Sequence, residues 1–230
     1  LVATDGAAGL PEHAPFDRII ATCAVPSIPL TWVRQTSPGG VILADLKPAP
    51  GAGSLIRLTR YPDRAEGRFD PTYAAFMDLR HQSADQLTDR PPSPERAPGE
   101  PERRTTTLDP RTPWTSLVAW FIATFTLGPG ISIGYDRPDE NWKPTVTSVA
   151  TGDGSWAEVA LADDHGTHQV LEAGPRRVWH LVEQAHSLWT ALGQPGWDRF
   201  GLTVTDNSQH VWIDNPAGRH IWPLLIEHSP

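Results

Sequence analysis

Short runs of Ile, Val and Leu, bounded by Gly, Pro and Asp, recur along the first third of the chain. They fall at residues 1–3, 17–25, 40–46 and 54–60. The second and third runs carry apolar residues at successive positions without clean alternation, which favours strands buried on both faces of a parallel sheet covered by helices. Between them, residues 28–36 are long enough for about two helical turns. The pattern predicts an α/β fold with a parallel sheet for residues 1–80.

The composition changes abruptly at residue 81. Residues 81–107 contain five prolines, alternating charges and no aromatic residue. Such a segment has little apolar surface to bury, so it is expected to form a solvated, partly extended linker.

Beyond this linker, residues 108–230 hold nine of the ten tryptophans. The patterns predict helices over 114–126 and 176–192, hairpins that join 146–150 to 156–161 and 202–205 to 210–213, and a last apolar stretch at 221–226. The second helix carries an apolar stripe at helical spacing. This region is predicted to be a separate, Trp-rich α+β accessory domain.

Charge and cysteine content exclude several classes of function. The net charge is −8, and Lys47 and Lys143 are the only lysines, so neither nucleic acid nor a membrane surface is an expected partner. The longest apolar run, around residues 117–125, is well below the ~18–20 residues that span a bilayer. Cys23 is the only cysteine, which excludes an internal disulfide and any cysteine-rich zinc site. A soluble, cytoplasmic protein is expected.

Few residues suggest acid–base or metal chemistry. The histidine pairs 165/168 and 180/186 lack the i, i+4 spacing of a helical metal pair, so no metal site is expected. Cys23 could be a nucleophile, but its apolar strand and the lack of a neighbouring base favour a structural thiol. Asp5-Gly6 is more informative, because this pair at the carboxyl end of a parallel strand places a carboxylate and a bare backbone where such sheets bind ligands. The alternative is a turn that only caps the strand.

Four motifs around this pair extend the pattern. They are Asp-Gly-x-x-Gly at 5–9, Pro-x-x-Ala-Pro-Phe-Asp-Arg-Ile-Ile at 11–20, Ala-x-x-x-Ile-Pro at 24–29 and Gln-x-x-Pro-Gly-Gly at 35–40. In order and spacing the series resembles the second half of the protein-L-isoaspartate O-methyltransferase family, which implies the C-terminal part of a Rossmann-like methyltransferase sheet. The resemblance covers about residues 1–80 and ends at Phe-Met-Asp-Leu-Arg, residues 76–80.

The resemblance implies methylation, dependent on S-adenosylmethionine, of a carboxylate on an aspartyl or isoaspartyl residue of a peptide or protein. Asp5 and Gly6 match the pair that contacts adenine. Thr22, Cys23, Ala24 and Val25 match the rim between cofactor and substrate. A carboxylate is already nucleophilic at neutral pH, so catalysis would rest on alignment in a dry pocket, and no catalytic acid or base is assigned.

The family's Gly-rich first strand has no counterpart in this sequence. Residues 1–3 look like the tail of a strand, so we expect a C-terminal portion of a longer protein. We also expect this chain alone not to bind S-adenosylmethionine measurably. The linker and the Trp-rich region resemble the C-terminal extension of actinobacterial relatives in lanthipeptide and ATP-grasp clusters, which implies a ribosomally made precursor peptide as the partner.

Three functions fit these observations. The first is a peptide-modifying aspartyl O-methyltransferase whose Trp-rich domain binds the precursor. The second is a truncated, non-catalytic module that binds a peptide or another partner. The third is a repair methyltransferase with an unrelated extension. The number of tryptophans favours a recognition surface, since one small core rarely needs so many.

Overall fold

The structure is a computed structural model that describes residues 2–79 and 100–224. The chain separates into two compact units, each of which is described by itself. Unit 1 comprises residues 1–48, 53–88 and 195–230, and unit 2 comprises residues 49–52 and 89–194. Unit 1 is therefore built from both ends of the chain.

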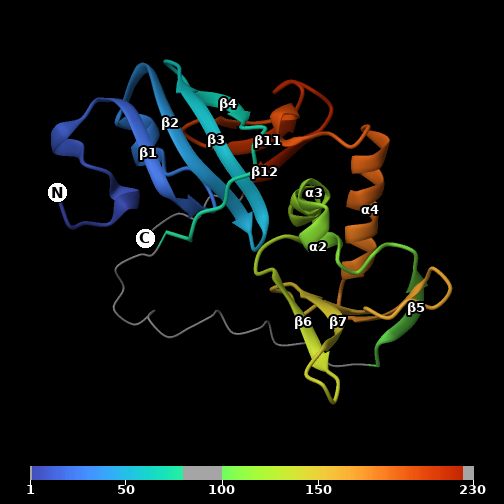
Figure 1. The fold of residues 1–230 in the computed structure, drawn as a ribbon. Helices are drawn as coiled ribbons and strands as arrows, with labels where there is room; N and C mark the ends of the chain where they lie inside the picture. The colour runs from blue at the N-terminus through green and yellow to red at the C-terminus, as the bar shows by residue number, and fades with distance from the viewer. Residues whose placement is uncertain (1, 80–99, 225–230) are drawn as a thin grey trace. The chain divides into compact units, whose positions relative to one another are not determined.

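Unit 1 contains a seven-stranded sheet in the order β1-β2-β3-β4-β10-β11-β12 (Figure 1). Its elements are η1 (Gly6–Ala8), η2 (Pro11–His13), β1 (Phe16–Val25), α1 (Leu30–Arg34), β2 (Thr36–Ala49), β3 (Ala52–Arg60), β4 (Ala65–Phe69), η4 (Trp197–Arg199), β10 (Phe200–Val204), β11 (Gln209–Ile213) and β12 (Ile221–Leu224). The three predicted strands over 17–25, 40–46 and 54–60 are confirmed as β1, β2 and β3.

The first two strands form the α/β part of the sheet. β1 pairs with β2 in parallel, and the chain crosses between them through α1. This confirms the predicted α/β class, although α1 is shorter than predicted because β2 already begins at Thr36. The predicted burial on both faces holds for β2 and is wrong for β1, where Ile20 is 68% exposed. β1 is an edge strand of the sheet, so fewer neighbours cover it. Val2 and Ala3 form no strand, contrary to the prediction for residues 1–3.

The C-terminal strands belong to this same sheet. β10 pairs antiparallel with β4, and Gln209 on β11 is 1% exposed. The Gln209 side chain accepts a hydrogen bond from the Ile28 amide at 3.0 Å and donates one to the Ile28 carbonyl at 2.7 Å. The boundary predicted at residue 108 is therefore wrong for the strands after residue 195. Their hairpin was predicted correctly, but local patterns do not reveal that its partner is β4.

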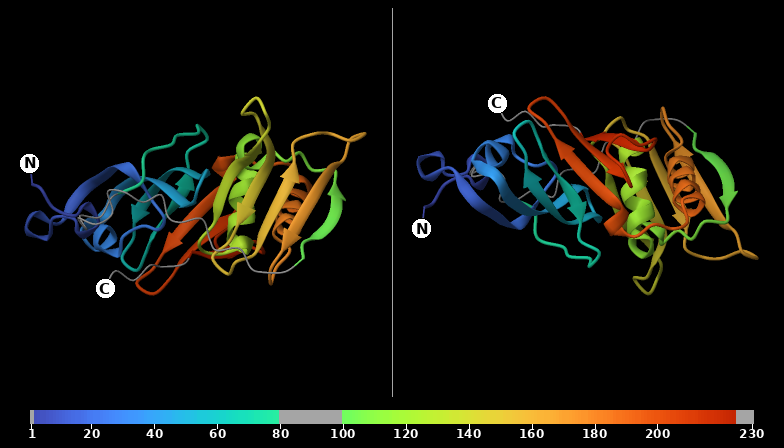
Figure 2. Two further views of the ribbon diagram at one scale, coloured as in Figure 1. Left: turned by 90° about the horizontal axis from the view of Figure 1, so that it is seen from below. Right: turned by 90° about the horizontal axis from the view of Figure 1, so that it is seen from above.

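Unit 2 contains a five-stranded sheet in the order β5-β9-β8-β7-β6. Its elements are β5 (Glu102–Thr106), α2 (Thr112–Thr115), α3 (Leu117–Leu127), β6 (Ser132–Pro138), β7 (Pro144–Ala150), β8 (Trp156–Ala160), β9 (His168–Ala173) and α4 (Val178–Ala191). All neighbouring strands pair antiparallel. α3 and α4 cover one face of the sheet (Figure 2).

The helices of unit 2 follow the apolar pattern with one difference. α4 is confirmed over most of the predicted range, and Val178, Val182 and Ala185 of its stripe are buried. The helix predicted over 114–126 is divided into α2 and α3 at Ser116, whose ψ of 64° is not helical. α3 is buried on nearly every side, and Gly128 at its end has a φ of +75°, which favours glycine.

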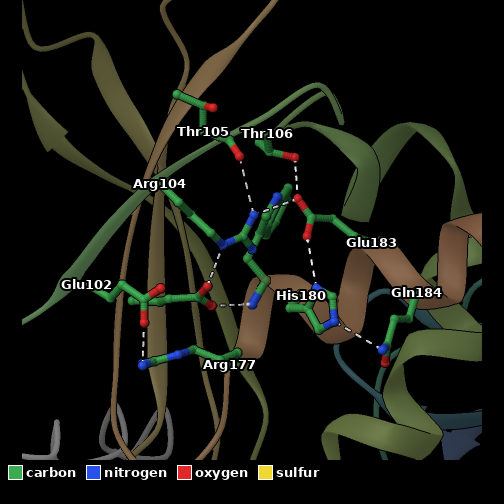
Figure 3. A network of polar contacts seen from close by, with 10 residues as sticks. Glu102, Arg104, Thr105, Thr106, Arg177, His180, Glu183 and Gln184 are labelled. Carbon is green, nitrogen blue, oxygen red and sulfur yellow. Dashed lines mark hydrogen bonds and ion pairs between the residues drawn. The ribbon is translucent and has the colours of Figure 1, made fainter.

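β5 lies in the segment predicted to be linker, so that prediction is wrong for residues 102–106. Residues 81–99 of the predicted linker lie outside the described residues. β5 pairs antiparallel with β9, and Arg104 from β5 bonds Glu172 at 2.7 Å. Arg104 also bonds Glu183 at 2.8 Å (Figure 3). Glu172 also accepts a hydrogen bond from the Trp179 amide in the first turn of α4 at 3.1 Å. This network joins β5, β9 and α4, and it explains why so polar a segment is ordered.

The tryptophans serve mainly as core. In the region predicted to be Trp-rich, five are buried, namely Trp120, Trp156, Trp179, Trp197 and Trp212. Trp114, Trp189 and Trp222 are half-buried, and Trp142 is 86% exposed. Two cores, one in each unit, thus use most of these side chains, and recognition through the exposed Trp142 stays a prediction.

Candidate functional site

A pocket of about 420 Å³ lies along β1 in unit 1. Its lining is mainly apolar and comprises Val2, Thr4, Gly6, Gly9, Leu10, Phe16, Arg18, Ile19, Ile20, Ala21, Thr22, Cys23, Trp32, Gln35 and Leu79. This volume lies within the range of about 300–1,000 Å³ typical of small-molecule sites. The pocket brings together Gly6, Thr22 and Cys23, three of the six residues that the sequence proposed for ligand binding.

The loop over residues 5–10 forms one wall of this pocket. Asp5 caps η1, and its Oδ1 accepts a hydrogen bond from the Ala7 amide at 2.9 Å. The Trp32 indole donates to the Gly6 carbonyl at 2.8 Å. Gln35 donates to the Ala8 carbonyl at 3.0 Å and accepts from the Leu10 amide at 2.8 Å. The loop is thus fixed by α1 and the residue that follows it.

This packing explains two of the sequence motifs. Gly9 has a φ of +67°, and a Cβ at this position would lie 2.2 Å from the Gln35 side-chain oxygen. The glycine of Asp-Gly-x-x-Gly and the glutamine of Gln-x-x-Pro-Gly-Gly are therefore neighbours in space. Trp32 had no role in the sequence analysis, and only the fold places it under Gly6.

The predicted rim at residues 22–25 is divided along the length of β1. Thr22 and Cys23 line the pocket, whereas Ala24 and Val25 are each 1% exposed and lie in the core. Burial raises the pKa of the Cys23 thiol, and the negative charge of Asp45 raises it further. Cys23 is therefore protonated at neutral pH, which agrees with a structural thiol.

Residues 73–79, which we call the strap, cross the ends of three strands. The Ala74 amide bonds Ser54 of β3 at 3.2 Å, and the Phe76 amide bonds Asp45 of β2 at 2.8 Å. Ala24 of β1 donates to the Met77 carbonyl and accepts from the Leu79 amide, both at 2.8 Å. The strap thus reaches the pocket at Leu79 and borders its rim at Ala24.

Asp45 is the buried acidic group of this region. It is 1% exposed, and its Oδ1 has no hydrogen-bond partner among the described residues. Burial raises the pKa of this carboxyl, an effect opposed by the Phe76 amide and by Lys47. Asp45 was not predicted as a site residue, although an aspartate in an otherwise apolar strand is a visible signal in the sequence.

No group of three or more potential metal-ligating side chains occurs within residues 2–79 and 100–224. No helix in these same segments is long and apolar enough to cross a membrane.

The segment that carries the pocket matches a known family. Residues 1–68 match the profile of the family described as Protein-L-isoaspartate(D-aspartate) O-methyltransferase (PCMT). Residues 1–68 therefore resemble this methyltransferase family. The loop at 5–10, the pocket residues of β1 and Asp45 all lie inside the matched segment, which confirms the resemblance drawn from the four motifs.

Individual relatives show the same partial match. Protein-L-isoaspartate O-methyltransferase 1 of Anaeromyxobacter sp. is 49% identical over 75 residues, which are 33% of this chain and 35% of that protein. The Protein-L-isoaspartate O-methyltransferase of Pyrobaculum neutrophilum is 42% identical over 76 residues, 33% of this chain and 36% of its own length. The chain thus matches about a third of the length of these curated relatives.

A solved structure titled protein-L-isoaspartate O-methyltransferase aligns with 93% of this chain and 59% of its own length, at 16% identity and a TM-score of 0.41.

Proposed function

We propose that unit 1 forms part of a carboxyl O-methyltransferase that uses S-adenosylmethionine and acts on isoaspartyl or aspartyl residues of a peptide or protein. The observation that carries this proposal is the match of residues 1–68 to the methyltransferase family. The pocket along β1 supports it, since the matched motifs converge there.

The pocket offers features that suit such a cofactor. Gly6 and Gly9 expose backbone without a side chain, Trp32 supplies an aromatic surface, and the lining is largely apolar. When bound, S-adenosylmethionine supplies an activated methyl group on a sulfonium. In our proposal the 5–10 loop binds the nucleoside side of the cofactor through Gly6, while Asp5 holds the loop in shape. Thr22 and Cys23 then face the substrate.

The chain's own residues would act by orientation and by exclusion of water. An ionised substrate carboxylate needs no general base, so its oxygen only has to be held in line with the methyl group. The protonated Cys23 thiol adds no competing nucleophile at neutral pH. Leu79 and Ile19 add apolar surface to the pocket, which limits the access of water.

Methyl transfer tests this proposal directly. The natural protein that carries this chain is incubated with radiolabelled S-adenosylmethionine and with three peptides that differ only in a central isoaspartate, aspartate or asparagine. We expect base-labile label on an acidic peptide and none on the asparagine peptide. Absence of label from both acidic peptides would contradict the proposal, and calorimetry on residues 1–230 tests whether they bind the cofactor.

A second candidate is a peptide-binding or partner-binding module without catalysis, and Trp142 favours it. This side chain is 86% exposed on the β6–β7 connection, where the Asp139 carboxylate accepts hydrogen bonds from the Asn141 and Lys143 amides at 2.8 and 2.9 Å. An ordered, exposed tryptophan is a common anchor at interfaces. A ribosomally made precursor peptide is the partner that we propose for it.

Substitution of this tryptophan tests the second candidate. If unit 2 binds the precursor, Trp142→Ala should raise Kd for the full precursor by roughly tenfold, the usual effect of losing one anchor side chain. Kd for a minimal acidic peptide should not change. Tyr61→Ala is the control, since this side chain is 41% exposed and lies in unit 1. Equal Kd values for parent and Trp142→Ala would remove the support for recognition by unit 2.

A further inference from the structure

The strap combines a buried polar attachment with exposed apolar side chains. Among the described residues, nine large apolar or aromatic side chains are exposed. Five of these lie on the strap or line the pocket: Val2, Ile20, Tyr73, Phe76 and Met77. Single exposed apolar residues are ordinary, but their concentration around one pocket marks an interaction site.

The strap is attached to unit 1 mainly through its backbone. Its partners Ser54 and Asp45 are 0% and 1% exposed, and Lys47 donates to the Phe76 carbonyl at 3.1 Å. Met77 is 79% exposed, so burial of its side chain contributes little to the attachment, whereas Phe76 is partly buried and 37% exposed. Apolar residues usually hold a segment against a core, whereas here polar groups hold the segment and leave its apolar side chains available.

The strap is also continuous with the candidate pocket. Asp78 forms an isolated parallel bridge with Ala24, directly after the pocket residues Thr22 and Cys23. Leu79 lines the pocket itself. A polypeptide whose acidic residue enters this pocket would therefore have neighbouring residues beside the strap.

The charges and the exposed apolar side chains of the strap indicate which kind of partner it binds. Lys47 and Asp78 form an ion pair with each other, so these two charges offset one another at the surface. The next segment of this chain, residues 80–99, has Leu87 as its only large apolar residue and is a poor match for the exposed Phe76 and Met77. An external chain with apolar side chains suits this surface better.

We propose that the strap is a docking surface for polypeptides that carry apolar side chains next to the acidic target residue. This inference rests on the proposed function for the identity of that target residue. The apolar side chains bury against Phe76 and Met77, and the backbone attachment keeps the strap in place before the ligand arrives, which lowers the entropic cost of binding.

Peptide binding without a methyl donor tests this inference apart from catalysis. Two fluorescent peptides share a central aspartate, flanked in one by Leu and Val and in the other by Ser and Gly. We expect the chain of 230 residues to bind the apolar-flanked peptide more tightly. Phe76→Ser/Met77→Ser should weaken that binding roughly fivefold or more, given the apolar area removed, and leave the polar-flanked peptide unaffected.

The matched control is Ile221→Ser, which removes a 40% exposed apolar side chain from β12 of the same unit. This variant should bind both peptides like the parent. Equal affinity of the strap variant and the parent for the apolar-flanked peptide would overturn the inference, as would absence of binding to the parent. A parent dimer that the strap substitutions abolish, seen by analytical ultracentrifugation, would assign the surface to self-association instead. Because no methyl donor is present, failure of methyl transfer would not affect these outcomes.

Discussion

Asp45 shows how one buried side chain links β2, the strap and the pocket. One carboxylate oxygen accepts from the Phe76 amide, and the other has no partner among the described residues. The nearby Cys23 thiol, whose pKa the Asp45 charge raises, lines the pocket. As the chain's only cysteine, Cys23 reports on this environment without any engineered label.

Two substitutions of Asp45 separate its charge from its hydrogen bond. Asp45→Asn keeps an acceptor for the Phe76 amide and removes the negative charge, so the pKa of Cys23 should fall while the strap stays attached. Asp45→Ala removes the acceptor as well and should release the strap. The rate of alkylation of Cys23 as a function of pH measures both effects.

In Asp45→Asn the alkylation midpoint should move to lower pH, with an unchanged rate at the high-pH plateau. In Asp45→Ala the plateau rate should also rise, by roughly tenfold if about 1.4 kcal/mol of protection is lost with the hydrogen bond. Asp17→Asn, on the exposed part of β1, serves as the control and should leave the profile unchanged. Identical profiles for both Asp45 variants and the parent would show that Asp45 does not hold the strap.

At the scale of elements, β5 depends on ion pairs rather than on apolar burial. The Arg104 guanidinium bonds two carboxylates, and its pKa is raised by its hydrogen bonds and ion pairs with Glu183 and Glu172 against the opposing effect of burial. The Glu172 side chain is 1% exposed. Loss of its partner would leave a charge buried without compensation.

Arg104→Met should therefore destabilise unit 2 by about 3–5 kcal/mol, the usual cost of breaking a buried ion pair. Arg104→Met/Glu172→Gln should recover much of this loss, since glutamine is neutral and still offers an oxygen to the Trp179 amide. Urea unfolding followed by tryptophan fluorescence measures these free energies. Arg103→Met, at the exposed neighbouring position on β5, should change stability little. Equal stability of Arg104→Met and Arg103→Met would contradict this account.

The Arg176 side chain joins the C-terminal end of α3 to the β7–β8 connection, and this contact is sensitive to pH. Arg176 donates to the carbonyls of Thr126 and Leu127 at 3.0 and 2.7 Å and to Asp153 at 2.7 Å. The Arg176 hydrogen bond, followed by that of Thr151, lowers the pKa of Asp153 well below its ordinary value. Asp153 therefore stabilises the folded state above its unfolded pKa of about 3.9, and this contribution is lost as pH falls through the folded pKa.

Asp153→Asn should lower the unfolding free energy at pH 7 by roughly 1 kcal/mol, a modest value because the side chain is more than a third exposed. The difference from the parent should shrink steadily below about pH 4. Thermal unfolding at pH 7, 4 and 2.5 tests this, with Asp163→Asn in another exposed turn of unit 2 as the control. A difference that grows toward low pH would contradict the assignment.

At the scale of the whole molecule, the two units predict which fragments fold. Residues 89–194 contain every strand and helix of unit 2 that the structure describes, whereas residues 108–230 lack β5 and carry β10–β12 without their partner β4. The fragment of residues 89–194 should therefore unfold cooperatively, whereas the fragment of residues 108–230 should expose apolar surface. Thermal unfolding and dye binding measure this difference, and cooperative unfolding of 108–230 alone would contradict the division.

Local sequence patterns were sufficient for many individual elements. β1, β2, β3, α4 and the hairpins β7–β8 and β10–β11 follow from apolar runs and turn residues, because these signals act over a few neighbouring positions. The four motifs also identified the family that residues 1–68 match. They placed Gly6, Thr22 and Cys23 in one site by resemblance, and the structure brings these residues to one pocket.

Contacts between residues that are distant in sequence could be identified only from the tertiary structure. The Gln209 side chain bonds Ile28 across 181 positions, and no local pattern encodes such a pairing. For the same reason, the strand that contains Arg104 and Thr106 was not predicted. It lies in a polar segment, and its partners Glu172 and Glu183 come much later in the chain. The sequence by itself determined the elements and the family resemblance of residues 1–68. Burial and long-range hydrogen bonds decided which tryptophans are core, which unit each strand joins, and that Asp45 and the strap border the pocket.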